Sequence, residues 1–131
     1  MGLRIEHVAI QVPDPVAAAD WYVKNLGMSI ARKYELPTNC RFLLGSGDTV
    51  MIEIYNNPKA TVPDYRKMDT LHLHFAYYSE NIEADRARLI AAGATPETEV
   101  IHTPDDDYVT MLRDPWGVPL QLVKRTNKML K

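Results

Sequence analysis

The sequence predicts an α+β fold in which a strand–helix–three-strand module occurs twice. A short alternating apolar run with a histidine occupies residues 5–12 and returns, altered, at residues 71–77. A helical segment ending at a glycine follows each run, at Gly27 and at Gly93. Self-similarity at one period decides the fold when it is present, and a period near half the chain indicates a duplicated module rather than a solenoid.

The offset between equivalent positions supports the duplication. His7 is aligned with His72 at an offset of 65 residues (72 − 7), and Glu53 is aligned with Gln121 at an offset of 68 (121 − 53). The offset therefore drifts by only three residues across half the chain. We expect one domain over residues 1–131, made of repeats at about 4–57 and 70–125 joined by a linker.

Composition excludes several classes of function. The chain has 131 residues and a net charge of −2, which argues against charge-driven binding to nucleic acid or to an anionic membrane. No apolar segment has the length of a membrane span, and a strand begins almost at once, without a signal peptide, so we expect a cytoplasmic protein. Cys40 is the only cysteine, so a bound metal would need His, carboxylate or amide ligands.

The first predicted strand has two different faces. Residues 5–12 alternate, so the apolar side chains share one face while His7, Ala9 and Gln11 share the other. The apolar face is expected to pack on a helix, which leaves the histidine face open. Gln11 is therefore a candidate for contact with a substrate.

The first helix is predicted from residue 15 to residue 26. Asp14 is a typical N-cap, and Pro15 at the first helical position needs no N–H donor. Gly27 supplies the left-handed residue that ends a helix. The apolar stripe expected to be buried consists of Val16, Ala19, Val23 and Leu26.

The other elements follow from alternation and turn residues. Strands are expected at residues 28–34, 40–44 and 49–55, before a linker at 56–69. In the second module a strand at 71–77 precedes a helix at 82–92, capped by Ser79 or Asn81 and closed by Gly93. The last three strands are expected at residues 97–101, 108–112 and 118–123.

Four polar side chains occupy equivalent places in the two repeats. If an approximate two-fold axis relates the modules, His7, Glu53, His72 and Gln121 converge on one concave surface. Two imidazoles, a carboxylate and an amide oxygen suit a divalent first-row metal such as Mn, Fe, Co, Ni or Zn. A histidine on a strand is more often structural, but the repeat favours metal ligation here. For Gln121, the lining of a metal-free pocket stays an alternative.

His74 is a second candidate for chemistry. It follows His72 by two residues on the same predicted strand face, about 7 Å further along, and its counterpart in the first module is Ala9. A histidine with a pKa near neutrality inside a cavity can move a proton. A hydrogen-bonded position in the core is an equally good reading of His74.

At these motifs the whole chain resembles the vicinal oxygen chelate superfamily, which includes glyoxalase I, methylmalonyl-CoA epimerase, extradiol dioxygenases and the fosfomycin- and bleomycin-resistance proteins. The resemblance rests on Glu6-His7-Val8-Ala9-Ile10, Asn25-Leu26-Gly27-Met28, Ile52-Glu53-Ile54, Asp114-Pro115-Trp116-Gly117 and Leu120-Gln121-Leu122. It implies two modules forming an open, eight-stranded, barrel-like sheet around a metal. It also implies His7, Glu53, His72 and Gln121 as ligands.

One position departs from the family pattern. Gln121 stands where the last module usually supplies Glu, and glutamine is no base. A shell of two His, one Glu and one Gln is similar to that of the epimerases, with the Glu and the Gln exchanged between modules. Glu53 is then the candidate base, with His74 as a second candidate for proton transfer.

The resemblance leads us to expect a metal-dependent lyase or isomerase acting on a small substrate with adjacent oxygens. The alternative is a non-catalytic binding protein of the bleomycin-resistance type. A third reading is an extradiol-type dioxygenase, for which His7, His72 and Glu53 supply the ligand count. Related proteins of this length pair up and a sheet of this kind leaves edges to cover, so we expect a homodimer.

Overall fold

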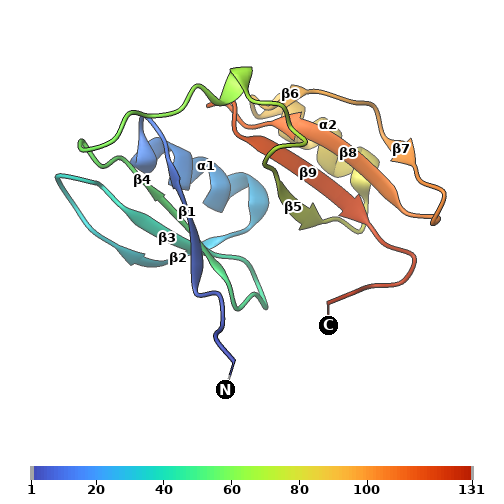
Figure 1. Cartoon of the computed structure of the whole chain (residues 1–131). Coiled ribbons are helices and arrows are strands. Elements are labelled where there is room, and N and C mark those ends of the chain that lie inside the picture. Colours follow the sequence, from blue (N-terminus) through green and yellow to red (C-terminus); the bar gives the residue numbers. More distant parts are fainter. Residues whose placement is uncertain (1, 131) are drawn as a thin grey trace. The chain divides into compact units, whose positions relative to one another are not determined.

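The computed structural model describes residues 2–130, and the chain divides into two compact units, Met1–Pro63 and Asp64–Lys131. Each unit has its own sheet, and a helix lies on one face of that sheet (Figure 1). The predicted α+β class and glyoxalase-like architecture are confirmed, with the strands of the described residues arranged as two hydrogen-bonded sheets.

The first unit contains one helix and a four-stranded sheet in the order β1-β4-β3-β2. β1 runs parallel to β4, and the other neighbours are antiparallel. The elements are β1 (His7–Gln11), α1 (Pro15–Leu26), β2 (Ser29–Lys33), β3 (Arg41–Leu44) and β4 (Met51–Tyr55). β1 and β2 are the edge strands of this sheet.

Helix α1 has the predicted bounds because its end signals are local. The Asp14 side chain accepts a hydrogen bond from the N–H of Ala17 at 3.1 Å, and Gly27 adopts φ 67°. The predicted buried stripe is partly wrong, because the helix turns a neighbouring face to the sheet. Buried positions of that face are Ala18, Ala19 and Tyr22, whereas Val16 and Val23 are exposed.

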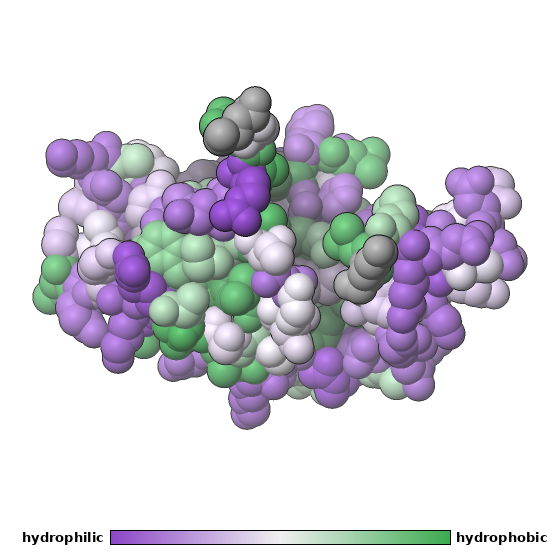
Figure 2. All heavy atoms as spheres, turned by 90° about the horizontal axis from the view of Figure 1, so that it is seen from below, coloured by the Kyte–Doolittle hydropathy of each residue, from purple (hydrophilic) through white to green (hydrophobic). Residues whose placement is uncertain are grey.

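The core of the first unit lies between α1 and the sheet. Helix α1 packs on β2, β3 and β4, where Leu43 and Ile54 have no exposed surface. Full burial of such a side chain stabilises the fold by about 1.5–3 kcal/mol. Apolar side chains are also exposed around this unit, Ile5 and Val8 among them, and Figure 2 shows such side chains between polar ones on the lower surface.

The second unit contains a mixed sheet in the order β5-β9-β8-β6, with β7 paired to β8. β5 runs parallel to β9, as β1 does to β4. The elements are η1 (Tyr65–Lys67), β5 (Phe75–Tyr78), α2 (Ile82–Ala91), β6 (Thr95–Pro96), β7 (Ile101–His102), β8 (Tyr108–Arg113) and β9 (Pro119–Lys124). Asn81, one of the two predicted caps, accepts from the N–H of Ala84 at 3.2 Å.

Two predicted strands of the second unit need correction. The strand predicted at 71–77 begins only at Phe75, because the preceding residues form a turn in which the N–H of His72 donates to the carbonyl of Asp69. The strand predicted at 97–101 is replaced by β6 and β7. Both β6 and β7 pair with β8. Between them, the carbonyl of Met111 accepts hydrogen bonds from the N–H groups of two successive residues, 97 and 98, and this irregularity interrupts the ladder.

Arg113 ties the start of the second unit to its sheet. Its guanidinium is buried and donates to the carbonyl oxygens of Tyr65 at 2.6 Å, Met68 at 2.7 Å and Gly117 at 3.2 Å. Buried donors of this kind need such acceptors. The end of the predicted linker, including η1, is therefore part of the second unit.

Residues 2–130 include no helix with both the length and the apolar composition needed to cross a bilayer.

Candidate functional site

The open face of the first unit is the sheet face opposite α1. Strand pairing places Ala9 beside Glu53, Glu53 beside Phe42, and Phe42 beside Arg32. Partners in a sheet point to the same side, and alternation adds His7, two residues before Ala9. The open face therefore carries the predicted pair His7 and Glu53 together with an aromatic and a basic side chain.

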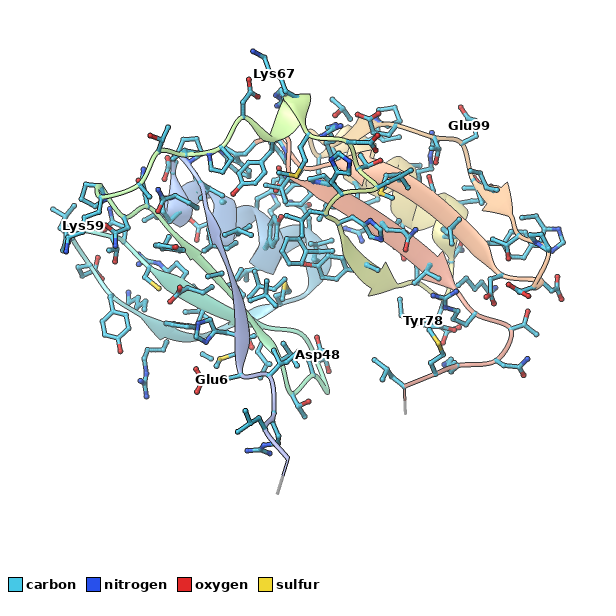
Figure 3. The ribbon with its side chains drawn as sticks, viewed as in Figure 1. Glu6, Asp48, Lys59, Lys67, Tyr78 and Glu99 are labelled. Atoms are coloured by element: carbon cyan, nitrogen blue, oxygen red, sulfur yellow. The ribbon has the colours of Figure 1, made fainter. Side chains whose placement is uncertain are left out.

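His7 is held in a defined orientation on this face. Its Nδ1 lies 2.9 Å from Oε1 of Glu6, which Figure 3 labels at the start of β1, and its ring packs edge-on against Phe42 with centroids 5.3 Å apart. A carboxylate only accepts, so Nδ1 carries the proton of the neutral ring. The lone pair of Nε2 is thus available to a metal or a substrate.

Glu53 has a thiol as its neighbour. The Sγ of buried Cys40 donates to Oε2 of Glu53 at 3.4 Å. Burial, and then the negative charge of Glu53, raise the pKa of Cys40 to about 12. Cys40 is accordingly a neutral donor at physiological pH, and it positions the Glu53 carboxylate rather than serving as a nucleophile.

The side chain of Gln11 forms hydrogen bonds within the first unit. Its side-chain amide donates to the carbonyl of Ala60 at 2.5 Å and accepts from the N–H of Asn57 at 2.8 Å, and only 7% of the residue is exposed. Both ends of the amide therefore hold the segment after β4. Contact between Gln11 and a substrate stays a prediction.

A cavity of about 190 Å³ opens on the first unit. It is lined by Glu6, Ala31, Arg32, Phe42 and Met51. The sequence indicated His7 and Glu53 but not this lining. Alternation along the predicted strand at 40–44 was enough to place Phe42 on one face with Cys40, whereas nothing local indicates the direction of Arg32.

In the second unit, strand register changes the assignment of the histidines. Ala76 of β5 pairs with Gln121 of β9, as Ala9 pairs with Glu53 in the first unit. The residue two positions before Ala76 is His74, so the equivalent of His7 is His74, at an offset of 67 residues (74 − 7). The alignment of His7 with His72 is therefore two residues out of register, and His72 is an exposed turn residue.

His74 also shares the hydrogen bonding of His7. Its Nδ1 lies 2.9 Å from the carbonyl oxygen of Thr70. A carbonyl only accepts, so Nδ1 again carries the proton and Nε2 keeps its lone pair. Metal-binding histidines typically donate their second ring nitrogen to an oxygen in this way.

Each unit by itself offers two of the predicted metal donors. His7 and Glu53 belong to the first unit, and a histidine and Gln121 belong to the second. Within residues 2–130, no three His, Cys, Asp or Glu side chains are grouped closely enough to hold a metal ion. The donor chemistry fits a divalent metal, but neither unit completes a metal site alone.

A second cavity, of about 480 Å³, lies in the second unit on the other side of the sheet from Gln121. Tyr108 and Lys124 form a cross-strand pair there, and the start of α2 with Glu80 and Glu83 completes much of the lining. Glu80 is paired with Lys128 at 2.9 Å, which holds the pKa of the Glu80 carboxyl below its usual range. None of the predicted site residues lines this cavity.

Comparison with known proteins gives one family. Residues 4–122 match the profile of the glyoxalase/bleomycin resistance protein/dioxygenase superfamily. A search of curated proteins found no significant match.

Solved structures share the fold. A glyoxalase family protein from Bacillus cereus has 17% identity and a TM-score of 0.82, covering 97% of each chain. A glyoxalase I mutant from Zea mays has 21% identity and a TM-score of 0.75, over 95% of this chain and 46% of that one. An antibiotic binding protein from a Streptomyces species has 19% identity and a TM-score of 0.69, over 95% and 97%.

Proposed function

Because this chain belongs to the glyoxalase/bleomycin resistance protein/dioxygenase superfamily, we propose that it is a divalent-metal-dependent lyase or isomerase. Its substrate is a small molecule that binds the metal through adjacent oxygens. The proposed ligands are His7 and Glu53 from the first unit and His74 and Gln121 from the second. His74 takes the place that the sequence alignment gave to His72.

The repeated strand register carries this proposal. In each unit a histidine stands two residues before an alanine of the first strand, within β1 for His7 and just before β5 for His74, and the alanine pairs with Glu53 or with Gln121. Both histidines have Nδ1 engaged by an oxygen, at 2.9 Å in each case. A duplicated pair of imidazole and oxygen donors supports metal ligation better than a pair of unrelated structural histidines.

The proposed chemistry needs one proton acceptor. A bound metal would polarise the substrate carbonyl and stabilise the enolate that forms when the neighbouring C–H loses its proton. Glu53 accepts that proton and returns it to a different carbon or to the other face of the same carbon, so the reaction is balanced without a further reactant. Cys40 donates to Oε2 of Glu53 at 3.4 Å, so Oε1 is the oxygen that would both bind the metal and accept the proton. The amide of Gln121 binds and orients without exchanging protons.

Metal analysis of single variants tests the assignment. We expect near-stoichiometric Ni, Co, Zn, Mn or Fe in the protein purified without chelator, and its loss from the His7→Ala and His74→Ala variants. His72→Ala is the matched control, because it removes a histidine only two residues from His74. Metal loss from His72→Ala alone would restore the original alignment. An absence of metal even after loading would contradict the enzyme proposal.

Base function has a separate test. Glutamine in place of Glu53 keeps an oxygen ligand and removes the base. We expect the Glu53→Gln variant to retain metal and to lose exchange of the substrate proton with solvent deuterium, followed by NMR. Unchanged exchange with metal still bound would remove Glu53 from the mechanism.

The second candidate function is sequestration of a small molecule without turnover. Its support is the aromatic part of the open face, where His7 and Tyr34 both pack edge-on against Phe42, at 5.3 and 6.4 Å between centroids. Such a surface binds flat apolar ligands without a metal. A metal-free protein with ligand affinity would favour this function, and stoichiometric iron would favour the dioxygenase.

A homodimer and a cytoplasmic location complete the proposal. β1 is an edge strand, and Ile5 and Val8 around its start are 66% and 40% exposed. An edge strand with exposed apolar side chains presents unpaired backbone groups to which another chain can bind. Light scattering coupled to size exclusion is expected to give about twice 14.9 kDa, and a monomer would contradict the expectation.

A further inference from the structure

A one-residue bulge in β2 determines which side chain faces the candidate site. Ile30 pairs with Leu43, but the next pair is Arg32 with Phe42, so Ala31 is the extra residue. In a regular ladder Ala31 would pair with Phe42, and Arg32 would point to the α1 side. The bulge therefore turns Arg32 onto the open face, and bulges are known to redirect side chains beside active sites.

Arg32 lies in line with the proposed metal ligands of the first unit. Arg32, Phe42 and Glu53 are successive cross-strand neighbours. Neighbouring strands are about 4.8 Å apart, so the backbone of Arg32 lies roughly 10 Å from that of Glu53. The same cavity of about 190 Å³ is lined by Arg32, Phe42 and Met51. An apolar surface thus separates a basic group from the metal-binding end.

The charge on Arg32 is not neutralised by the described part of the chain. Two other basic residues of this hairpin, Lys33 and Arg41, approach the carboxylate of Glu35 at 3.9 and 4.0 Å. Over residues 2–130, no carboxylate lies within salt-bridge range of Arg32, whose guanidinium donates to the hydroxyl of Tyr34 at 3.5 Å. One such contact leaves most of its five N–H donors available.

Glu6 is the one acidic residue in the lining of the cavity. Its Oε1 is directed to Nδ1 of His7 at 2.9 Å. Because the ring of His7 is neutral, the carboxylates of Glu6 and Glu53 make the histidine end of the face negative, whereas the Arg32 end is positive. A planar guanidinium with free donors matches a carboxylate in two parallel hydrogen bonds.

We propose that Arg32 selects organic acids, binding a carboxylate at one end of a ligand whose other end carries the adjacent oxygens. This inference rests on the proposed function for the metal-binding end. The backbones of Arg32 and Glu53, which carry the groups for the two ends of the ligand, lie about 10 Å apart. The part of the ligand between its ends is flat and apolar where it contacts Phe42 and Met51.

Two hydroxamates that differ by one charge test the proposal. 4-Carboxybenzohydroxamate has metal-binding oxygens at one end and a carboxylate at the other, and 4-carbamoylbenzohydroxamate replaces the carboxylate by a neutral amide of similar shape. Calorimetry on zinc-loaded and chelator-treated protein gives both affinities. We expect the wild type to bind the carboxylate about tenfold more tightly, the usual gain from a charge-assisted pair.

Two variants isolate Arg32. Arg32→Gln is expected to abolish the tenfold preference, whereas Lys33→Gln, with the same change of charge on the neighbouring residue and the opposite face, is expected to keep it. A preference that persists in Arg32→Gln, a wild type without preference, or no binding of either probe would each overturn the proposal. The metal-binding end is tested separately. Both probes carry the same hydroxamate, so zinc must raise the affinity of the protein for both probes equally. A preference without any zinc effect refutes the proposed function and leaves the role of Arg32 intact.

Discussion

Replacing Gly117 by alanine is expected to destabilise the second unit far more than the same change at Gly47 destabilises the first. Both glycines have a positive φ, 91° at Gly117 and 77° at Gly47. Their surroundings differ. A Cβ on Gly117 would lie 2.6 Å from Cγ and 3.2 Å from the backbone nitrogen of Arg66, whereas a Cβ on Gly47 would meet nothing within 4 Å.

The expected loss of unfolding free energy has two contributions, the backbone conformation and the overpacking. A left-handed conformation costs an L-residue about 1–2 kcal/mol, and both variants lose this amount. Overpacking adds about 1–3 kcal/mol at Gly117 alone, because the Arg66 backbone is fixed by its turn. We therefore expect losses of about 1–2 kcal/mol for Gly47→Ala and about 2–5 kcal/mol for Gly117→Ala.

Urea unfolding of the two variants and the wild type, followed by far-UV circular dichroism, measures the difference. The slope with urea concentration must be unchanged for the midpoints to report stability. Equal losses in the two variants would refute the close approach of residue 66 to the turn at 114–117. A separate transition for each unit would be fitted separately, since the two changes lie in different units.

Three further predictions concern local interactions. Asp14→Ala removes the N-cap of α1 and should cost about 1 kcal/mol in urea unfolding; no change would mean that the cap contributes nothing. In chelator-treated protein at pH 8, Cys40 should react with a disulfide reagent about 10³-fold more slowly than a free thiol, because its pKa lies at about 12 instead of 9.0. Glu53→Gln should accelerate that reaction at least about tenfold, and an unchanged rate would contradict the contact. A hydrogen bond from the N–H of Thr126 holds the pKa of Asp107 below its usual range. Ionised Asp107 therefore stabilises the folded state above about pH 3.9, and this stabilisation is lost as the pH falls through the pKa of Asp107 in the folded state. Asp107→Asn should make the free energy of unfolding depend less on pH at acid pH. The same pH dependence in the variant and the wild type would exclude that role.

Local signals in the sequence were sufficient for the first helix. The N-cap Asp14, the proline after it and the closing Gly27 each act within a few residues, so the predicted bounds and the observed ones agree. The buried face of α1 could not be predicted from local signals. Hydrophobicity favours Val16 and Val23, but the direction from which α1 meets the sheet decides, and that direction buries Tyr22 instead.

The candidate site could likewise be predicted only in part from the sequence. His7 and Glu53 could be singled out because alternation places each on one face of its strand. The choice between His72 and His74 could not be made in this way, because the two differ by two residues and share the same parity. A repeated pattern of histidine two residues before alanine, at 7–9 and 74–76, was the signal in the sequence that favours His74. The pairing of Ala76 with Gln121 establishes the register. The direction of Arg32 likewise depends on a bulge, which no residue in β2 signals.

The contacts of Arg113 change where the chain can be divided. Counting repeats suggests a cut close to residue 70, but Arg113 holds the backbone carbonyls of Tyr65 and Met68. A second fragment that begins at residue 70 would keep the Gly117 carbonyl and the Glu97 carboxylate beside Arg113 but would lose two acceptors of its buried guanidinium. Each donor left unpaired costs about 1–3 kcal/mol. A natural fusion, a circular permutation or a laboratory split is therefore expected to be tolerated better just before residue 64, where the two compact units divide, than at residue 70.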